Sequence, residues 1–318
     1  MSMYQEIADA SQRISPEILK TPLFYSTYLS DLNKGEVYLK LESEQYTGSF
    51  KARGALNKVL KLSQADRDKG LITASTGNHA QGFARALTIA KAKGTIFLPT
   101  NAEPSKVDAL KYYDADLQFH GDDPLTTELH AKQVAQDLGQ IWVSPYNDFD
   151  VIAGQGTLAV EVTEELKNID AVFGCIGGGG MMSGVASWFK QESPETKVIG
   201  CLPANSPEMY LSVQKGEVVV LDEYQPTLSD GSAGGLEEDS ITFGLCQKLV
   251  DAYELVSEEE IAARIRYMVD KHHKIVEGAA AVALSAFMNN ATDHMGQRIV
   301  IIICGANITT SKLRELIT

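Results

Sequence analysis

The sequence has few cysteines, no excess of positive charge and no long hydrophobic run, and each shortage excludes a class of protein. The 318 residues include four cysteines, whose wide spacing fits neither a disulfide framework nor a zinc site. The formal net charge of −14 argues against nucleic acid or an anionic membrane as a partner, because both need clustered lysine and arginine. We therefore expect buried, reduced thiols and a protein that binds neither nucleic acid nor a membrane.

Apolar segments are short throughout. None reaches the roughly 18 consecutive apolar residues of a membrane helix, and the first 15 residues lack the basic start and apolar run of a secretory signal. We predict a cytoplasmic protein. The six histidines have no metal-ligand spacing, and His272 and His273, in a basic helical stretch, are predicted to face solvent.

Strand-like and helix-like segments alternate along the chain. A helix over 4–18, a strand over 37–41 and a helix over 50–62 come first, and three strand–helix units fill 70–138. After a linker at 145–148, the helices are predicted over 157–166, 181–190, 208–215, 242–250 and 278–288, and the strands over 170–176, 198–201, 251–256 and 298–304. This alternation predicts an α/β protein of two domains, each an open, mainly parallel sheet flanked by helices, with the strand 298–304 central in its sheet.

Four consecutive glycines follow the predicted strand 170–176 and precede a helix. They expose backbone N–H groups with no side chain in the way, and the helix N-terminus behind them carries partial positive charge. Their spacing differs from the dinucleotide fingerprint and from the P-loop. A flexible turn would cost backbone entropy without structural return. We therefore predict a phosphate-binding loop at Gly177, Gly178, Gly179 and Gly180.

A second loop, at 75–79 (Ser-Thr-Gly-Asn-His), lies at the same kind of strand-to-helix junction. Its backbone N–H groups and hydroxyls suit a carboxylate, and Asn78 can hydrogen-bond a ring substituent. Taken alone, the loop is equally consistent with a helix N-cap. Ligands of open parallel sheets lie at the carboxyl ends of strands, however, where both loops are expected.

Two further candidates are ambiguous by themselves. Lys51 follows a turn-rich segment and opens a helix, so it is either a nucleophile or an ordinary surface lysine. Cys304 follows the last strand, where its thiol could hydrogen-bond a ring nitrogen or simply be a small buried residue.

Five motifs together occur in the order and approximate spacing of the fold-type II pyridoxal-phosphate enzymes. They lie at 49–54, 75–79, 153–157, 177–180 and 304–307. From about Thr21 to the C-terminus the chain resembles the branch of threonine/serine dehydratases and serine racemases. The resemblance implies a tryptophan synthase beta-like fold, with a large cofactor-binding domain (1–66 and 148–318), a small mobile domain (67–147) and a homodimer.

The resemblance also implies pyridoxal 5'-phosphate as the cofactor and a role for each motif. Lys51 would form the Schiff base with the cofactor aldehyde, and Gly177 to Gly180 would hold the phosphate together with Met181. The ring would contact Phe50, Asn78, Glu277 and Cys304. The substrate carboxylate would be received by Ser75, Thr76, Gly77 and His79.

The activity implied is beta-elimination of L-threonine and/or L-serine to a 2-oxo acid and ammonia. The freed Lys51 amine would remove the alpha proton, with a pKa lowered by burial and a nearby cation. Three alternatives stay open: a serine racemase, a dehydratase of another beta-hydroxy amino acid such as hydroxyaspartate, and a catalytically inactive protein that keeps the phosphate-binding loop. The presence of Lys51 argues against the third.

The chain departs from the family pattern at four places. Racemases of this group carry serine where this chain has Thr76, whose hydroxyl could act opposite Lys51 but whose methyl group crowds it. Leu202 replaces a cation-binding glutamate and Glu208 lies near the second ligand position, so we predict no metal site. Ala306 stands where glycine is usual. The chain stops soon after the last strand, so we expect no C-terminal regulatory domain.

Overall fold

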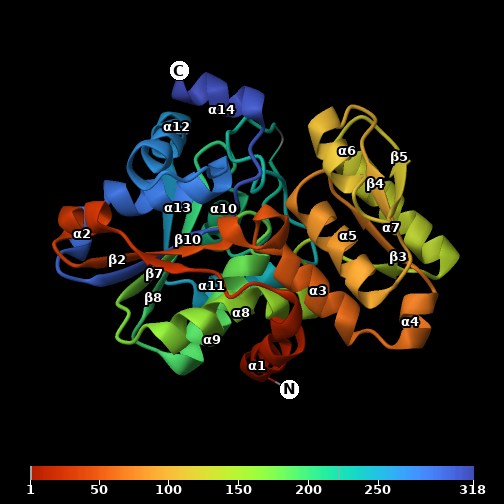
Figure 1. Ribbon diagram of the computed structural model, residues 1–318, viewed down its shortest axis with the longest axis horizontal. Coiled ribbons are helices and arrows are strands. Elements are labelled where there is room, and N and C mark those ends of the chain that lie inside the picture. The colour runs from red at the N-terminus through yellow and green to blue at the C-terminus, as the bar shows by residue number, and fades with distance from the viewer. Residues whose placement is uncertain (1, 222) are drawn as a thin grey trace.

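The computed structural model describes residues 2–221 and 223–318 and contains two sheets flanked by helices (Figure 1). The larger sheet has six strands in the order β1-β2-β10-β7-β8-β9. All neighbours are parallel except β1, which is antiparallel to β2. The strands are β1 (Leu23–Tyr25), β2 (Glu36–Leu41), β7 (Ala171–Cys175), β8 (Lys197–Pro203), β9 (Ala252–Val256) and β10 (Arg298–Ile303).

The smaller sheet has four parallel strands in the order β5-β4-β3-β6. They are β3 (Leu71–Ala74), β4 (Gly94–Leu98), β5 (Asp116–Phe119) and β6 (Ile141–Trp142). The helices α5 (Asn78–Ala90) and α6 (Pro104–Leu110) lie with this sheet, and α7 (Pro124–Leu138) packs against β3, β4 and β6. The predicted α/β class is therefore confirmed, whereas the boundaries at 67 and 147 and any movement of the smaller part stay predictions.

The remaining helices surround the larger sheet. They are α1 (Met3–Ile14), α2 (Thr27–Asn33), α3 (Lys51–Lys61), α8 (Phe149–Glu165), α9 (Gly180–Glu192), α10 (Glu208–Lys215), α11 (Ile241–Leu249), α12 (Glu258–Tyr267), α13 (Gly278–Asn289) and α14 (Thr310–Ile317). The short helix α4 (Gln64–Asp68) lies instead on the side of the smaller sheet (Figure 1). The small-residue helix α13 packs on β7, β8 and β10, while α9, backed by α8, lies on the other side (Figure 1). Because β10 is covered on both faces, its run of isoleucines is buried, which confirms its predicted central place.

The two parts of the molecule meet where α5 packs on α3. A Cβ atom at Gly82 of α5 would lie 2.9 Å from the Lys51 carbonyl oxygen, so the backbones touch. The first turn of α3 is thus held between the larger sheet and the smaller one, at the place where Lys51 begins the helix.

Two predicted helix boundaries were wrong. The first helix ends at Ile14, and a 3₁₀ turn (Ser15–Glu17) follows, because Pro16 has no N–H group to continue the helical ladder. Helix α8 begins at Phe149, eight residues before the predicted start. Asp148 caps it by accepting from Asp150 N and Val151 N, and Gly154 within the helix allows close contact with the backbone of α3.

His272 was predicted to face solvent and does not. It is 8% exposed, and its Nε2 lies 2.8 Å from Ser26 Oγ. The reason is a π-helical turn (Met268–His272), which shifts the side-chain register after α12 and directs the ring inward. His273 is exposed as predicted. The strand β1 and the helices α2, α4 and α14 were not predicted at all.

The predicted state of the cysteines is confirmed, since all four are free and buried. Within the ranges 2–221 and 223–318, every helix is too short or too polar to cross a bilayer.

Candidate active site

The predicted functional loops meet at the carboxyl ends of parallel strands. The glycine loop follows β7, and Cys304 follows β10, the neighbour of β7 in the larger sheet. The 75–79 loop follows β3 of the smaller sheet and opens α5. Lys51 lies between them at the start of α3, so the structure brings together segments that are distant in sequence.

The segment before Lys51 is fixed against the end of β10. Phe50 N donates to Cys304 O (3.1 Å), and Ala306 N donates to Gly48 O (2.9 Å). Thr47 and Gly48 both have positive φ angles (65° and 71°), a sharp turn that aims the chain into α3. This pairing positions Lys51 relative to Cys304.

The Lys51 amine has one close partner, the carbonyl oxygen of Pro145 at 2.7 Å. The nitrogen also lies 5.3 Å from the centre of the Phe50 ring. Burial lowers the pKa of Lys51 to about 8, although Cys304 and Glu277 act in the opposite direction. At pH 7 about a tenth of the amine is therefore uncharged and able to act as a nucleophile or base, far more than for an ordinary lysine.

The glycine loop is rigidly seated. A Cβ atom at Gly178 would lie 2.5 Å from the Tyr146 ring, and one at Gly177 would lie 2.6 Å from Ser232 O. Gly179, with φ 83°, is the N-cap of α9, and Gly178 O accepts from Thr242 Oγ1 (2.6 Å). The first turn of α9 then leaves backbone N–H groups without intrahelical partners. Such a loop can hold an anion such as phosphate.

Asn78 and Glu277, from opposite sides of the boundary between the sheets, are in direct contact. Asn78 Nδ2 donates to Glu277 Oε1 (2.8 Å). Glu277 is 3% exposed, and burial, together with the nearby Asp230, raises the pKa of its carboxyl to about 7. The two residues predicted to lie near one ring are thus neighbours.

The 75–79 loop is shaped by its own hydrogen bonds. Gly77 N donates to Ser75 Oγ (3.2 Å), and Gly77 is the N-cap of α5. Ser75, Thr76 and Gly77 are half-buried. Because α5 begins at Asn78, the N–H groups of its first turn have no intrahelical acceptor. The loop therefore offers backbone donors of the kind that a carboxylate needs.

His79 does not point its imidazole into this loop. Its Nε2 lies 3.0 Å from Thr73 Oγ1 and 3.3 Å from Val143 O, and the residue is 2% exposed. Burial and the charge of Lys51 lower the pKa of His79 to about 3, so the ring is neutral. Of the predicted carboxylate contacts, His79 can contribute its backbone N–H but not its side chain.

Cys304 lies buried at the end of β10 beside the Lys51 segment. Burial raises the pKa of its thiol well above the ordinary value, with a further contribution from Glu277. The sulfur is therefore a neutral thiol and not a thiolate. Met181, in the first turn of α9, is also buried.

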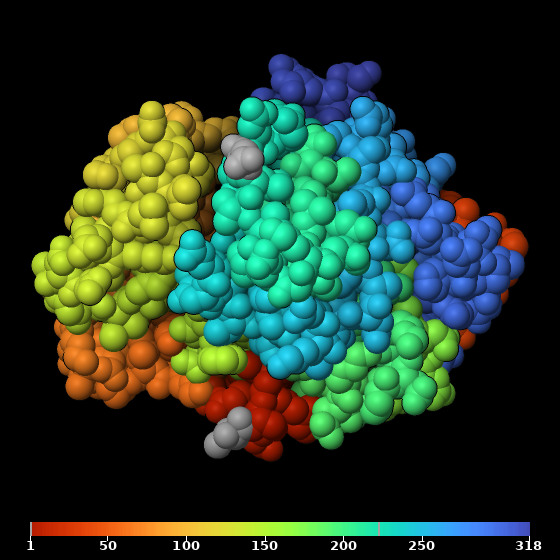
Figure 2. Space-filling model, turned by 180° about the vertical axis from the view of Figure 1, so that it is seen from behind, coloured from red at the N-terminus to blue at the C-terminus, as the bar shows by residue number. Residues whose placement is uncertain are grey.

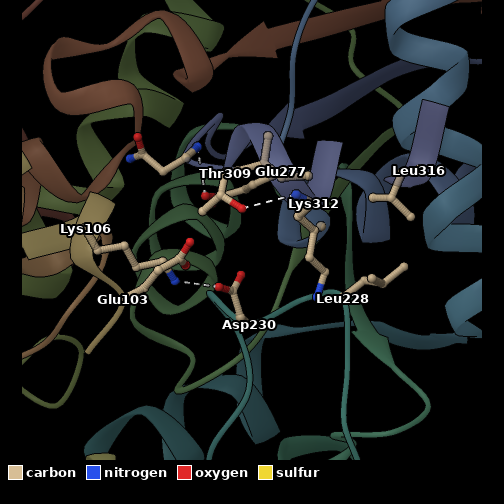
Figure 3. Close-up of a pocket in the computed structure, with 11 residues that line it drawn as sticks. Glu103, Lys106, Leu228, Asp230, Glu277, Thr309, Lys312 and Leu316 are labelled. Carbon is tan, nitrogen blue, oxygen red and sulfur yellow. Dashed lines mark hydrogen bonds and ion pairs between the residues drawn. The ribbon is translucent and has the colours of Figure 1, made fainter. Parts of the chain in front are cut away.

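A pocket of about 110 Å³ opens beside Glu277, between α6 and α14 (Figure 3). Lys106 of α6 reaches across it to Asp230, with 2.8 Å between Nζ and Oδ2. In Figure 2 a furrow separates the yellow residues of the smaller sheet from the teal segment that follows β8. The pocket places the buried Glu277 carboxyl close to an entrance between the two parts.

Residues 14–305 match the family model described as pyridoxal-phosphate dependent enzyme. The chain belongs to this family. Relatives of this chain include the L-threonine ammonia-lyase of Thermotoga maritima, which is 38% identical over 100% of this chain and 78% of the relative. The catabolic L-threonine dehydratase of Escherichia coli is 36% identical over 98% of this chain and 94% of the relative.

Solved structures agree with this assignment. The processed form of threonine deaminase isoform 2 from Solanum lycopersicum superposes with a TM-score of 0.93 at 36% identity, over 99% of this chain and 92% of that chain. Maize serine racemase superposes with a TM-score of 0.92 at 28% identity, over 99% and 96% of the two chains. The predicted family and fold type are confirmed.

The site of this pyridoxal-phosphate enzyme fits its cofactor. The glycine loop can hold a phosphate, because it leads into the N-terminus of α9, whose first-turn N–H groups have no intrahelical acceptors. Lys51 supplies an amine of lowered pKa, and Cys304 supplies a neutral thiol at the adjacent strand end.

Three contact residues were missed from the sequence. Pro145 supplies the acceptor for Lys51, Tyr146 packs on the glycine loop, and Asn307 contacts Asn78. Asn307 belongs to the motif at 304–307, which is a usable signal in the sequence. Pro145 and Tyr146 lie in the predicted linker 145–148, where no pattern indicates a role.

The two residues at which the resemblance predicts the loss of a cation site, Leu202 and Glu208, are both buried. Glu208 is 3% exposed and accepts from Ser206 Oγ (2.7 Å), and burial raises the pKa of its carboxyl. Leu202 is fully buried in apolar surroundings. Across the part of the chain that the structure describes, no cluster of three His, Cys, Asp or Glu residues could hold a metal ion. The prediction that no metal binds stays a prediction.

Proposed function

We propose that the protein eliminates water from L-threonine or L-serine and releases the 2-oxo acid and ammonia. The observation that carries the proposal is the buried Lys51 amine, with a pKa of about 8, at the start of α3 between the glycine loop and the 75–79 loop, which we propose bind the cofactor phosphate and the substrate carboxylate. The names of the relatives, L-threonine ammonia-lyase and L-threonine dehydratase, support threonine as a substrate.

The residues that would hold the cofactor come from five segments. Lys51 would anchor it, and Phe50 would pack on its ring. Asn78 would donate to the ring oxygen, Cys304 would face the ring nitrogen, and Glu277 would lie beside the ring. The phosphate would be bound by the backbone N–H groups of Gly177, Gly178, Gly179, Gly180 and Met181. When bound, the cofactor supplies an electron sink for charge that develops at the substrate alpha carbon.

The chain's own groups then perform the proton transfers. The neutral Lys51 amine takes the proton from the alpha carbon, and the Pro145 carbonyl orients that amine by accepting one of its hydrogens. Backbone N–H groups of Ser75, Thr76, Gly77 and His79 would hold the substrate carboxylate, which fixes the C–H bond toward Lys51. The bond from the beta carbon to the hydroxyl breaks, and the hydroxyl leaves as water with the proton that Lys51 took from the alpha carbon. The released enamine then takes up one water and yields the 2-oxo acid and ammonia.

The neutral thiol of Cys304 favours elimination. A carboxylate beside the ring nitrogen would keep that nitrogen protonated and increase its capacity to hold negative charge. The thiol, whose pKa burial raises, does neither. The ring then holds less of the negative charge that develops at the alpha carbon. Loss of the beta-hydroxyl therefore competes better with return of the proton to the alpha carbon.

We infer that the protein acts as a homodimer. Aromatic and aliphatic side chains are exposed together on β1, α2 and the segment that follows the π-helical turn: Phe24, Tyr25, Tyr28, Leu32 and Ile275. An apolar patch of this kind on a protein with a net charge of −14 suits a second copy of the chain. A small mobile domain over 67–147 and a cytoplasmic location also remain proposals.

Substrate tests decide between elimination and racemisation. The cofactor-loaded protein is incubated with L-threonine, L-serine and D-serine, and 2-oxo acid, ammonia and enantiomers are quantified. We expect equal amounts of 2-oxo acid and ammonia from L-threonine and L-serine. Accumulation of D-serine without pyruvate would favour the serine racemase alternative. If the protein lacks the visible absorbance of bound cofactor, the proposal is wrong.

A further inference from the structure

Asn307 joins three parts of the candidate site. Its Nδ2 donates to Thr47 O at 2.8 Å and to Asn78 Oδ1 at 2.5 Å. Its backbone N donates to Glu277 Oε2 at 3.2 Å. Asn78 Nδ2 in turn donates to Glu277 Oε1, which closes a ring of hydrogen bonds.

The chemistry of these partners fixes the direction of every hydrogen bond. A backbone carbonyl can only accept, so Thr47 O requires the NH₂ group of Asn307. The second hydrogen of that group then needs an acceptor, and Asn78 must present its oxygen to Asn307. The Asn78 NH₂ group is therefore turned to the other side, where one hydrogen meets Glu277 and the other is available to the site.

The surroundings keep Asn307 in this orientation. Thr47 is in the left-handed region, with φ 65°, which directs its carbonyl toward the Asn307 amide. A Cβ at Gly48 would lie 3.0 Å from Asn307 Oδ1, so only glycine leaves the amide this space without adjustment. Glu277, buried beside both asparagines, is an acceptor for the Asn78 NH₂ group and for the Asn307 backbone.

We propose that Asn307 is a positioning residue that sets the amide orientation of Asn78 and thereby aims an N–H, not a carbonyl oxygen, at the cofactor ring oxygen. This inference rests on the ring-oxygen role of Asn78 in the proposed function. Without Asn307, the Asn78 amide keeps only Glu277 as a fixed partner and loses the hydrogen bond that requires its oxygen to face residue 307. Asn307 itself touches neither the substrate nor the ring oxygen in this assignment.

A double-mutant cycle on cofactor affinity tests the proposal. The dissociation constant of pyridoxal phosphate is measured by titrating the cofactor-free wild type, Asn78→Ala, Asn307→Ala and the double variant. We expect each single variant to bind about tenfold more weakly, as for loss of one well-oriented hydrogen bond. The double variant should bind within about twofold of Asn78→Ala, because Asn307 acts through Asn78.

The same cycle separates this role from a structural one. If Asn307 mainly held the Thr47 turn ahead of Lys51, its loss would weaken binding equally in the Asn78→Ala background, and additive effects would overturn the inference. The visible absorption band of bound cofactor gives an independent readout, since it should shift alike in Asn307→Ala and Asn78→Ala. An unshifted band in Asn307→Ala contradicts the proposal.

Two further variants keep the result interpretable. Asn307→Asp preserves the shape but places an acceptor against Thr47 O and Asn78 Oδ1, so we expect binding at least as weak as in Asn307→Ala, and wild-type affinity would refute the inference. Asn289→Ser, at an exposed asparagine that donates to Glu260, is the matched control and should bind as the wild type does. If Asn78→Ala alone binds normally, the proposed role of Asn78 and this inference fall together, while cofactor binding by the wild type still stands.

Discussion

Among single residues, Lys51 is distinguished by what surrounds its amine. Its nitrogen is held by a backbone carbonyl and lies over an aromatic ring, with no carboxylate in direct contact. Most lysines that pair in this chain do so with aspartate or glutamate, as Lys58 does with Asp148 at 2.7 Å. A carbonyl partner leaves the amine free to lose its proton, because it stabilises the charged form less than a carboxylate would.

The amine of Lys51 should therefore titrate near pH 8 in the cofactor-free protein. Burial lowers the pKa of this group, so the neutral form predominates as the pH rises above about 8. Nitrogen NMR of ¹⁵N-lysine-labelled protein measures this directly, with Lys51→Arg to assign the signal. Titration of that signal above pH 10, as for an ordinary lysine, would contradict the picture of a desolvated base.

The balance between elimination and racemisation should depend on Thr76. Thr76 is half-buried in the 75–79 loop. In the proposed site its hydroxyl would exchange a proton on the face opposite Lys51, and its methyl group would crowd that position. Thr76→Ser should raise the ratio of D-serine to pyruvate formed from L-serine by about tenfold, a modest part of what a positioned acid or base supplies. Thr76→Ala is the control and should form no D-serine. An equal ratio in all three proteins would remove Thr76 from the chemistry.

At the level of elements, the start of α3 is anchored by a buried ion cluster. Arg53, which is fully buried, bonds Glu42 (Nε to Oε2, 2.7 Å) after β2 and Glu161 (Nη1 to Oε1, 2.7 Å) in α8. Lys40 in β2 donates to Thr21 O (2.7 Å) and pairs with the same Glu161. The cluster thus ties α3, α8 and the end of β2 together two residues after Lys51.

Arg53→Met should lower the free energy of unfolding by about 3–5 kcal/mol, because the substitution leaves two carboxylates buried without their main partner. Arg298→Met is the matched control, since Arg298 also bonds a glutamate, Glu36, but at the surface (Nε to Oε2, 2.8 Å). Loss of that exposed pair should cost about 0–1 kcal/mol. Denaturant unfolding measures the free energy of unfolding of both variants. If both lose the same amount, burial of the cluster does not determine its contribution to stability.

The elements that the sequence predicted best are those with an unbroken pattern. The isoleucine-rich β10 and the junctions before α5 and α9 were placed within two residues, because apolar runs and glycines mark them. The early start of α8 was missed because Gly154 and Gly156 look like helix breakers, whereas they serve close helix packing. The short elements β1 and α4 carry too few residues for a periodic signal.

The segments that form the site were predictable from their sequence motifs. Each motif marks its own segment, but contacts between segments do not appear in any local pattern. Lys51 and Pro145 are 94 residues apart in the chain, and Asn78 and Asn307 are 229 apart. The inward turn of the His79 ring likewise depends on Thr73 in β3 and on Val143, which directly follows the neighbouring strand β6.

For the whole molecule, two ion pairs span the boundary between the sheets. Lys106 pairs with Asp230 (2.8 Å), and Lys132 pairs with Glu237 (3.0 Å), so both α6 and α7 contact the segment that runs from α10 to α11. That segment also carries Ser232, which packs on the glycine loop. The arrangement is consistent with a small domain that closes on the site, which stays a proposal.

The proposed homodimer gives a prediction on the same scale. The wild type should sediment at twice the chain mass of 34.6 kDa. Tyr28→Glu combined with Ile275→Glu should shift it to the monomer, because both side chains are 53% exposed in one chain and would be buried by a partner. Tyr112→Glu, at a residue 90% exposed on the smaller part, is the control and should remain dimeric. A dimer that tolerates the double substitution would place the interface elsewhere.

The most direct test compares product release from L-threonine by the cofactor-supplied wild type and by Lys51→Ala. The wild type should release 2-oxobutanoate and ammonia in equal amounts. Lys51→Ala should be slower by at least about 10³-fold and should unfold at about the same temperature, since its amine makes no ion pair. Turnover by Lys51→Ala at the wild-type rate, or no 2-oxobutanoate from the cofactor-loaded wild type, would contradict the assignment of this lysine and of the reaction.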